Sequence, residues 1–219
     1  MHIRAYTWPI AVFFLTVFIF VGIAASVETG GWVASVDSLV GTWLHAQASP
    51  PITKVMLAIS FLGAPSTLTV VSVVVCVVLA RKHSYDRLIV VLTLVLGGNL
   101  LNYGLKSLLH RGRPVFEDPL LILSSYSFPS GHAMASTVFY GFVIGCVLSA
   151  RQRFAGLAIA GGTLMIALVG FSRVYLGVHY VSDVLAGTLE AIAWSTLVLA
   201  LWHYSRRRPQ GPGLRRRPR

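Results

Sequence analysis

Six long runs of apolar residues alternate with short polar segments along this chain, and each run is long enough to cross a lipid bilayer. A helix needs about 17–25 consecutive apolar residues to span the hydrocarbon core. Charged residues make up only 11% of the sequence, whereas soluble domains carry about 25%. The sequence therefore predicts an all-α fold, a polytopic integral membrane bundle of about six transmembrane helices. The expected spans lie near residues 8–26, 55–80, 88–109, 132–150, 154–175 and 182–204.

The chain divides into one predicted membrane domain, residues 1–205, and a basic tail, residues 206–219. The tail holds seven of the 18 lysine and arginine residues, and its proline and glycine content predicts disorder. Such a tail either contacts anionic lipid head groups or acts only as an orientation signal after the last span. The net charge of +11 is concentrated there, so no nucleic-acid partner is predicted. No pattern indicates a particular oligomeric state.

The short loops predict the orientation of the bundle, because basic residues beside membrane spans favour the cytoplasmic side. Both termini are therefore predicted to be cytoplasmic, in a bacterial inner membrane. The segments 27–54, 110–131 and 176–181 are predicted to face the periplasmic side. Besides the tail, the cations that favour this orientation are Arg4, Arg81, Lys82, Arg87, Arg151 and Arg153.

Two features near the N-terminus have alternative interpretations. The first span ends in Ala24-Ala25-Ser26, which resembles a signal-peptidase site, but its length favours an uncleaved anchor. The following segment predicts a short amphipathic helix, which either lies at the outer interface or covers other spans. Its apolar residues at helical spacing are Val36, Leu39, Val40, Trp43 and Leu44.

The polar residues that least fit a membrane bundle form three clusters, all predicted on the outer side. The first is "KSLLHRGRP", in which Lys106 and Arg113 are seven residues apart, about two turns if the helix continues. Both cations could then point to one place, although Lys106 alone also fits a lysine that extends toward head groups. The neighbouring His110 and Arg111 are interpreted as interfacial residues.

The second cluster is "FPSGHA", at the start of the fourth span. Ser130 and Gly131 would leave the unpaired N–H groups of a helix N-terminus open to a close anion, and His132 lies beside that anion site. An ordinary N-cap explains Ser130 equally well, but it does not explain His132.

The third cluster is "GFSRVYLGVHYVSDVLAG", between the fifth and sixth spans. His179 and Asp183 are four residues apart and would share a helix face, and Arg173 lies six residues before His179. A carboxylate beside an imidazole fixes its tautomer and stabilises the imidazolium. The flanking Gly170 and Gly187 are interpreted as close-contact positions between spans.

Together the three clusters predict a phosphate site. Three cations and a helix N-terminus suit a dianionic phosphate group, and two histidines suit covalent transfer with one nucleophile and one proton donor. No carboxylate cluster suits a divalent metal, so no metal and no cofactor are predicted. A protein that binds or carries phospholipid head groups without chemistry is the alternative, but it does not need the two histidines.

These residues resemble the signature of the type 2 phosphatidic acid phosphatase, or lipid phosphate phosphatase, superfamily. All three parts of the signature match in residue, spacing and order. They are Lys106 with Arg113-Pro114, then Pro129-Ser130-Gly131-His132, then Ser172-Arg173 with His179 and Asp183. The resemblance implies a membrane phosphatase that hydrolyses a lipid phosphate or pyrophosphate. Undecaprenyl pyrophosphate, phosphatidylglycerol phosphate and phosphatidic acid all remain open as substrates.

The resemblance also implies residue roles. His179 would attack phosphorus to form a phosphohistidine, Asp183 would orient His179, and His132 would protonate the leaving oxygen and then activate water. The phosphoryl oxygens would be held by Lys106, Arg113, Ser130, Gly131 and Arg173.

Other polar residues in the spans have weaker assignments. Asn99 and Asn102 share a helix face with Lys106 and are expected to hold helices together. Glu190 either supports the site or pairs with another span. Glu117 and Asp118 are expected to be exposed loop acids.

Overall fold

The structure, a computed structural model, describes residues 4–150 and 153–207, and these residues form helices and loops without a strand. The all-α prediction is therefore confirmed. The elements in chain order are α1 Arg4–Glu28, α2 Trp32–Ala46, α3 Pro50–Leu62, α4 Pro65–Arg81, α5 Tyr85–Leu92, the π-helical segment η1 Thr93–Gly97, α6 Gly98–Leu109, α7 Gly131–Ser149, α8 Ala155–Tyr175 and α9 Val181–Arg207.

Five helical stretches of the described chain are long and apolar enough to cross a membrane, and one bent pair of helices supplies a sixth span. The bent pair joins α3 and α4 at an angle of 41°. The other stretches are Trp8–Glu28, Tyr85–Leu109, Gly131–Ser149, Ala155–Tyr175 and Val181–Arg206. Their bounds agree with the predicted spans to within a few residues.

The second predicted span is present as a bent pair of helices, because the chain breaks after Leu62. Ala64 has an extended conformation, with φ −65° and ψ 135°, immediately before Pro65 at the start of α4. A proline disfavours the helical conformation of the residue before it and offers no N–H to the preceding turn. At the same break, a Cβ on Gly63 would lie 2.2 Å from a methyl carbon of Val169, so only glycine allows α8 to approach this closely.

The third span contains one π-helical turn, which Trp194 of α9 accommodates. The indole N–H of Trp194 donates to the carbonyl oxygens of Thr93 and Leu94, at 3.2 and 3.1 Å. A π turn leaves carbonyl groups without their usual α-helical donors, and the indole satisfies them. A Cβ on Gly97 would lie 2.3 Å from the same ring.

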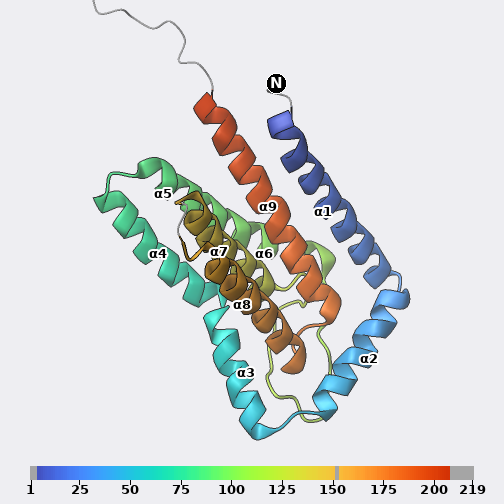
Figure 1. The fold of residues 1–219 in the computed structure, drawn as a ribbon. Helices are drawn as coiled ribbons and strands as arrows, with labels where there is room; N and C mark the ends of the chain where they lie inside the picture. Colours follow the sequence, from blue (N-terminus) through green and yellow to red (C-terminus); the bar gives the residue numbers. More distant parts are fainter. Residues whose placement is uncertain (1–3, 151–152, 208–219) are drawn as a thin grey trace, which may run out of the picture.

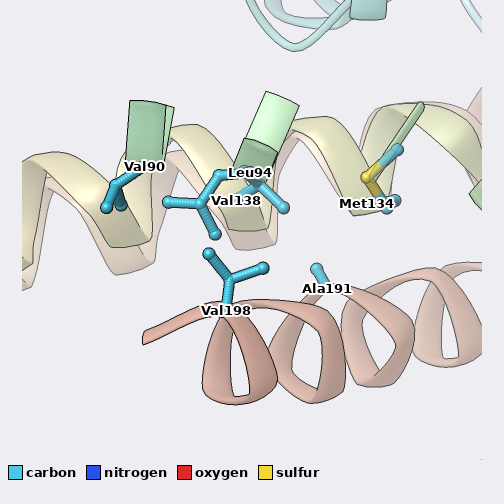
Figure 2. Close-up of a cluster of buried hydrophobic side chains, with 6 residues drawn as sticks. All are labelled: Val90, Leu94, Met134, Val138, Ala191 and Val198. Carbon is cyan, nitrogen blue, oxygen red and sulfur yellow. The ribbon is translucent and has the colours of Figure 1, made fainter. Parts of the chain in front are cut away.

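The inner apolar core lies among α5, η1, α7 and α9 (Figure 2). Its buried side chains meet across these elements, and Trp194 and Trp202 pack against them from α9. The buried members are Val90, Leu94, Met134, Val138, Ala191 and Val198. This core fixes the start of α7 against α9, which is where the second and third polar clusters meet.

Figure 1 shows α1 beside α9, and the start of α1, the end of α9 and the α4–α5 turn at one end of the bundle. The loop 110–130 lies at the opposite end, near α2 and α3. The predicted tail begins inside α9, since that helix continues to Arg207, and residues 208–219 lie outside the described residues.

Helix α2 has the amphipathic character that was predicted, and it covers other helices. It contacts α1, α8 and α9 through a face on which Asp37, Gly41 and Leu44 are buried. Trp32 and Leu39 remain exposed, at 75% and 71%. An apolar outer face of this kind suits the membrane interface.

Candidate active site

All eight predicted site residues gather at the end of the bundle that holds the loop 110–130 (Figure 1). They come from the ends of α6, α7, α8 and α9 and from the connecting loops. The eight residues are Lys106, Arg113, Ser130, Gly131, His132, Arg173, His179 and Asp183.

His179 lies in the turn between α8 and α9 and faces the first turn of α9. Gly177, with a φ of +69°, reverses the chain after α8, and the N–H groups of Val178 and His179 both donate to the carbonyl oxygen of Arg173. This turn places His179 Nδ1 3.2 Å from Asp183 Oδ2, which also accepts the N–H of Tyr180 at 2.9 Å. The predicted His–Asp pair is therefore present, with both side chains buried.

The imidazole of His179 is held in its neutral form. Burial lowers the pKa of His179 to about 4, and the hydrogen bond and charge of Asp183 oppose that shift only in part. Asp183 accepts at Nδ1, so the neutral ring carries its proton there and its lone pair at Nε2. Such a tautomer leaves Nε2 available as a nucleophile.

Arg113 lies directly in front of His179 Nε2. Its Nη1 is 3.3 Å from Nε2 and also donates to the carbonyl oxygen of Val178. Its Nε and Nη2 donate to the carbonyl oxygen and hydroxyl of Ser125, at 2.7 and 3.0 Å. Burial lowers the pKa of Arg113, and Asp183 opposes this change.

The predicted third span ends where α6 ends, and the helix does not continue to Arg113. The helix ends at Leu109, and His110 adopts a left-handed conformation with a φ of 47°. Arg113 therefore reaches the site from the loop. Lys106 points into the same region, since its Nζ donates to the carbonyl oxygens of Tyr126 and Ser127, at 2.8 and 3.1 Å.

The start of α7 is fixed to α9 through Ser130. Its N–H donates to the carbonyl oxygen of Asp183 at 2.9 Å, and its hydroxyl accepts the N–H of Ala133 at 3.4 Å, as an N-cap does. A Cβ on Gly187 would lie 2.3 Å from the Ser130 carbonyl oxygen. The prediction that Gly187 is a close-contact position is confirmed, and so is that for Gly170, where a Cβ would lie 2.7 Å from Val184.

His132, in the first turn of α7, lies among the charged groups of the site. It interacts with Arg173, His179, Arg113 and Lys106. Three cations and the second histidine thus surround this imidazole.

Arg173 contributes a buried guanidinium from the end of α8. Its Nη1 donates to the Ser60 hydroxyl at 2.5 Å, and only 2% of the residue is exposed. Its Nε is buried without a hydrogen-bond partner. A buried donor without an acceptor costs free energy, which an anionic oxygen beside Nε would offset.

The interpretation of Arg111 as an interfacial residue is wrong. Its guanidinium contacts the Asp183 carboxylate at 2.5 Å and the Asp37 carboxylate at 2.8 Å. This role was not predicted from the sequence, because a basic residue at a span end is commonly explained by contact with lipid head groups. Asp37 was missed as well, although a lone acid within an amphipathic helix was a usable signal.

The structure also gives the partners of the two asparagines, of Glu190 and of the loop acid Asp118. Asn102 Nδ2 donates to Glu190 Oε2 at 2.7 Å, so this pair joins α6 to α9, and Asn99 contacts Thr69 of α4 at 3.3 Å. Asp118 is 89% exposed and lies 2.9 Å from His45 Nε2. That hydrogen bond lowers the pKa of Asp118.

Residues 4–150 and 153–207 contain no group of three or more His, Cys, Asp or Glu side chains that could hold a metal ion. The described side chains at the site offer imidazole, carboxylate, guanidinium and ammonium groups. A histidine with an unprotonated Nε2, a carboxylate behind it and cations in front of it can support nucleophilic transfer of a phosphoryl group.

The fold and the site together define a polytopic membrane protein that carries a buried His–Asp pair and an anion-binding cluster. The chain belongs to the PAP2 superfamily, whose family model matches residues 87–207.

Relatives and a solved structure agree with this membership. Over 175 residues the chain is 35% identical to phosphatidylglycerophosphatase B of Bacillus subtilis, and this match covers 77% of this chain and 83% of that protein. It is also 35% identical over 83 residues to lipid phosphate phosphatase delta of Arabidopsis thaliana, covering 35% of this chain and 18% of that protein. The crystal structure of a transmembrane PAP2-type phosphatidylglycerolphosphate phosphatase from Bacillus subtilis superposes with a TM-score of 0.78. That match has 30% identity and covers 93% of this chain and 98% of the other.

The chain is therefore an integral membrane lipid phosphatase of the phosphatidylglycerophosphatase type, and the predicted family and enzyme class are confirmed. These relatives give no support to the alternative of a non-catalytic head-group carrier.

Proposed function

We propose that this protein hydrolyses the phosphate monoester of phosphatidylglycerol phosphate through a phosphohistidine on His179, without a metal ion. The observation that carries this proposal is the placement of His179, whose Nδ1 faces Asp183 Oδ2 at 3.2 Å and whose Nε2 faces the Arg113 guanidinium at 3.3 Å. One nitrogen is thus oriented and the other directed toward the cations that would hold a phosphate group.

In the first step, the lone pair of His179 Nε2 attacks phosphorus and the bond from phosphorus to the lipid oxygen breaks. The leaving oxygen takes a proton from protonated His132, and the lipid departs as an alcohol. The N–P bond leaves a positive charge on the His179 ring, which the Asp183 carboxylate stabilises through Nδ1–H.

In the second step, His132, now neutral, removes a proton from a water molecule that attacks phosphorus. The N–P bond breaks and its electron pair returns to His179 Nε2. Inorganic phosphate leaves, and His132 again carries the proton that the next cycle needs. Each step moves one proton and exchanges one bond at phosphorus, so the cycle balances without a cofactor.

The phosphoryl oxygens would be held by Lys106, Arg113 and Arg173 and by the start of α7. The unpaired Nε of Arg173 fits a buried anionic oxygen. The Gly131 N–H and the Ser130 hydroxyl lie at the positive end of the α7 dipole. Fixed positive groups of this kind stabilise the charge that spreads over the oxygens in the transition state.

We place the site on the periplasmic face of a bacterial inner membrane. The support is the distribution of cations, because Arg81, Lys82 and Arg87 flank the α4–α5 turn, at the end of the bundle away from the loop 110–130 (Figure 1). Positive residues in short loops favour the cytoplasm, so the site would face the other side.

The preference for phosphatidylglycerol phosphate rests on the Bacillus subtilis phosphatidylglycerophosphatase and its solved structure, most of whose length this chain matches. A panel of purified lipids in detergent tests it through kcat/KM, which measures specificity. The panel contains phosphatidylglycerol phosphate, phosphatidic acid and undecaprenyl pyrophosphate. A higher kcat/KM for either of the last two would contradict the assignment.

The mechanism is tested with His179→Gln and with His83→Gln as a matched control, since His83 lies in the exposed α4–α5 turn. His179→Gln should lower turnover by at least about 10⁴-fold, as loss of a nucleophile does. Rapid acid-free quenching with ³²P-labelled substrate should trap an acid-labile, base-stable label on wild type and on His83→Gln only. Activity should persist in EDTA. Full turnover by His179→Gln, or a strict Mg²⁺ requirement, would refute the mechanism.

A further inference from the structure

Arg111 bridges two buried carboxylates behind His179. Its Nη1 lies 2.5 Å from Asp183 Oδ1 and 2.7 Å from the Ser182 hydroxyl, and its Nη2 lies 2.8 Å from Asp37 Oδ2. The guanidinium carbon also lies 4.1 Å from the centroid of the Tyr180 ring. The two carboxylates and the Tyr180 ring together hold the Arg111 guanidinium in one position.

Asp37 comes from α2, a helix that the phosphatase signature does not include. The residue is only 2% exposed. Its Oδ1 accepts the N–H of Ser182 at 2.9 Å, and its Oδ2 accepts the Ser182 hydroxyl as well as Arg111. The start of α9 is thus tied to α2 through one carboxylate.

The two oxygens of Asp183 have different partners. Oδ1 accepts from Arg111, whereas Oδ2 faces His179 Nδ1 and accepts the N–H of Tyr180. Without Arg111 the carboxylate would lose the contact that fixes Oδ1 and could rotate away from His179. Misplacement of a catalytic group by about 1 Å can cost on the order of 10²-fold in rate.

The charges in this cluster do not cancel. One guanidinium lies between two carboxylates, so one negative charge remains when the imidazole is neutral. That charge is available to the cationic imidazole formed when His179 bonds to phosphorus. If Asp37 were neutral, Arg111 would pair with Asp183 alone and cancel much of its charge.

We infer that Arg111 and Asp37 are positioning residues for phosphoryl transfer: Arg111 orients the Asp183 carboxylate toward His179, and Asp37 prevents Arg111 from neutralising it. This inference rests on the nucleophilic role proposed for His179. Neither residue touches the reacting atoms, so both act through Asp183.

The other charged and titratable groups that face His179 are unchanged in the variants that test this inference. They are Arg113 from the loop, Arg173 from α8, His132 from α7 and Asp183 from α9. Any difference in the titration of His179 between variants would therefore report on Arg111 and Asp37.

The test compares full-length Arg111→Met, Arg111→Lys and Asp37→Asn in detergent with phosphatidylglycerol phosphate as substrate. Asp86→Asn is the matched control, because Asp86 forms an exposed ion pair with Arg206 far from the site. Arg111→Met and Asp37→Asn should each lower kcat by on the order of 10²-fold with KM changed only a few-fold. Arg111→Lys should recover part of the loss, and the control should match wild type.

The pH profile separates positioning from a merely structural role. Removal of a negative charge disfavours the imidazolium, so Asp37→Asn should move the acid limb of kcat/KM to lower pH. Removal of a positive charge has the opposite effect, so Arg111→Met should move it to higher pH.

The outcomes distinguish this inference from the proposed function. An inactive His179→Gln enzyme combined with wild-type kcat in Arg111→Met and Asp37→Asn would overturn the inference alone. A lower kcat without opposite shifts of the acid limb would also overturn it. If Arg111→Met does not fold, the near-isosteric Asp37→Asn decides the question by the same two measurements. Full turnover by His179→Gln would instead overturn the proposed function.

Discussion

His179 combines an unprotonated Nε2 with a position among cations, and the second property supports the first. Arg113, Arg173 and His132 all interact electrostatically with this imidazole, and Asp183 is the carboxylate that contacts it. Burial and the cations keep the ring neutral, so Nε2 can attack. The same cations would hold the substrate phosphate. One set of groups would therefore keep His179 unprotonated and bind the phosphorus centre that it attacks.

The titration of His179 predicts how stability depends on pH. The folded pKa of about 4 lies below the ordinary value of 6.5. The unfolded chain therefore takes up the proton first as the pH falls. This contribution to stability is full above pH 6.5 and is lost between pH 6.5 and 4, by roughly 3 kcal/mol at the lower limit.

Thermal unfolding in detergent across this pH range measures the effect. His179→Gln lacks the titration, so wild type should lose stability relative to this variant on acidification. His83→Gln, with its exposed side chain, should follow wild type. Parallel curves for wild type and His179→Gln would contradict the low pKa.

At the scale of helices, the site depends on the close approach of α7 and α9. The N–H of Ser130 donates to the Asp183 carbonyl oxygen, and Gly187 allows the Ser130 carbonyl oxygen to approach α9 closely. The start of α7, which would bind phosphate, is therefore placed directly against the turn of α9 that carries Asp183. Small residues at such crossings are common in membrane bundles.

Gly187→Ala should separate these two helices. The added Cβ would lie 2.3 Å from the Ser130 carbonyl oxygen and 3.3 Å from the Ala133 Cβ, and the first of these atoms is backbone that cannot move alone. Overpacking of this kind costs about 1–3 kcal/mol, and the displaced site should lose on the order of 10²-fold in kcat.

Gly141→Ala is the matched control for that substitution, because Gly141 also lies in a membrane helix and its Cβ would meet no atom within 4 Å. It should unfold and turn over as wild type does. Thermal unfolding and kcat are measured for both variants. Wild-type values for Gly187→Ala would show that the two helices are not fixed at this crossing.

Helices were easier to predict from the sequence than their irregularities. The bilayer sets a minimum length for each apolar run, so span positions follow from composition. The break before Pro65 carried a local signal, whereas the π turn at Thr93–Gly97 depends on Trp194, about a hundred residues away, and no local pattern indicates it. The signature residues were predicted because their spacing is local. The contact of Arg111 with Asp37 was not predicted, because it joins residues that are far apart in the sequence.

On the scale of the whole molecule, charge is distributed unequally between the two ends of the bundle. Arg81, Lys82 and Arg87 flank the exposed α4–α5 turn, whereas Lys106, Arg113 and Arg173 at the other end are partly or fully buried near His179. Exposed cations beside a span can orient a membrane protein. Buried cations would instead bind the phosphate group of a substrate. The orientation proposed above follows from the first group alone.

Single cysteines test this orientation in whole cells. Cys76→Ala and Cys146→Ala remove the native thiols, after which Val115→Cys or Lys82→Cys introduces one label site. Val115 is 93% exposed in the loop 110–130, and Lys82 is exposed at the α4–α5 turn. A membrane-impermeant maleimide should label Val115→Cys in intact spheroplasts, but Lys82→Cys only after permeabilisation. The reverse pattern would place the His179 site on the cytoplasmic side, and the substrate would then have to be reached from the inner leaflet.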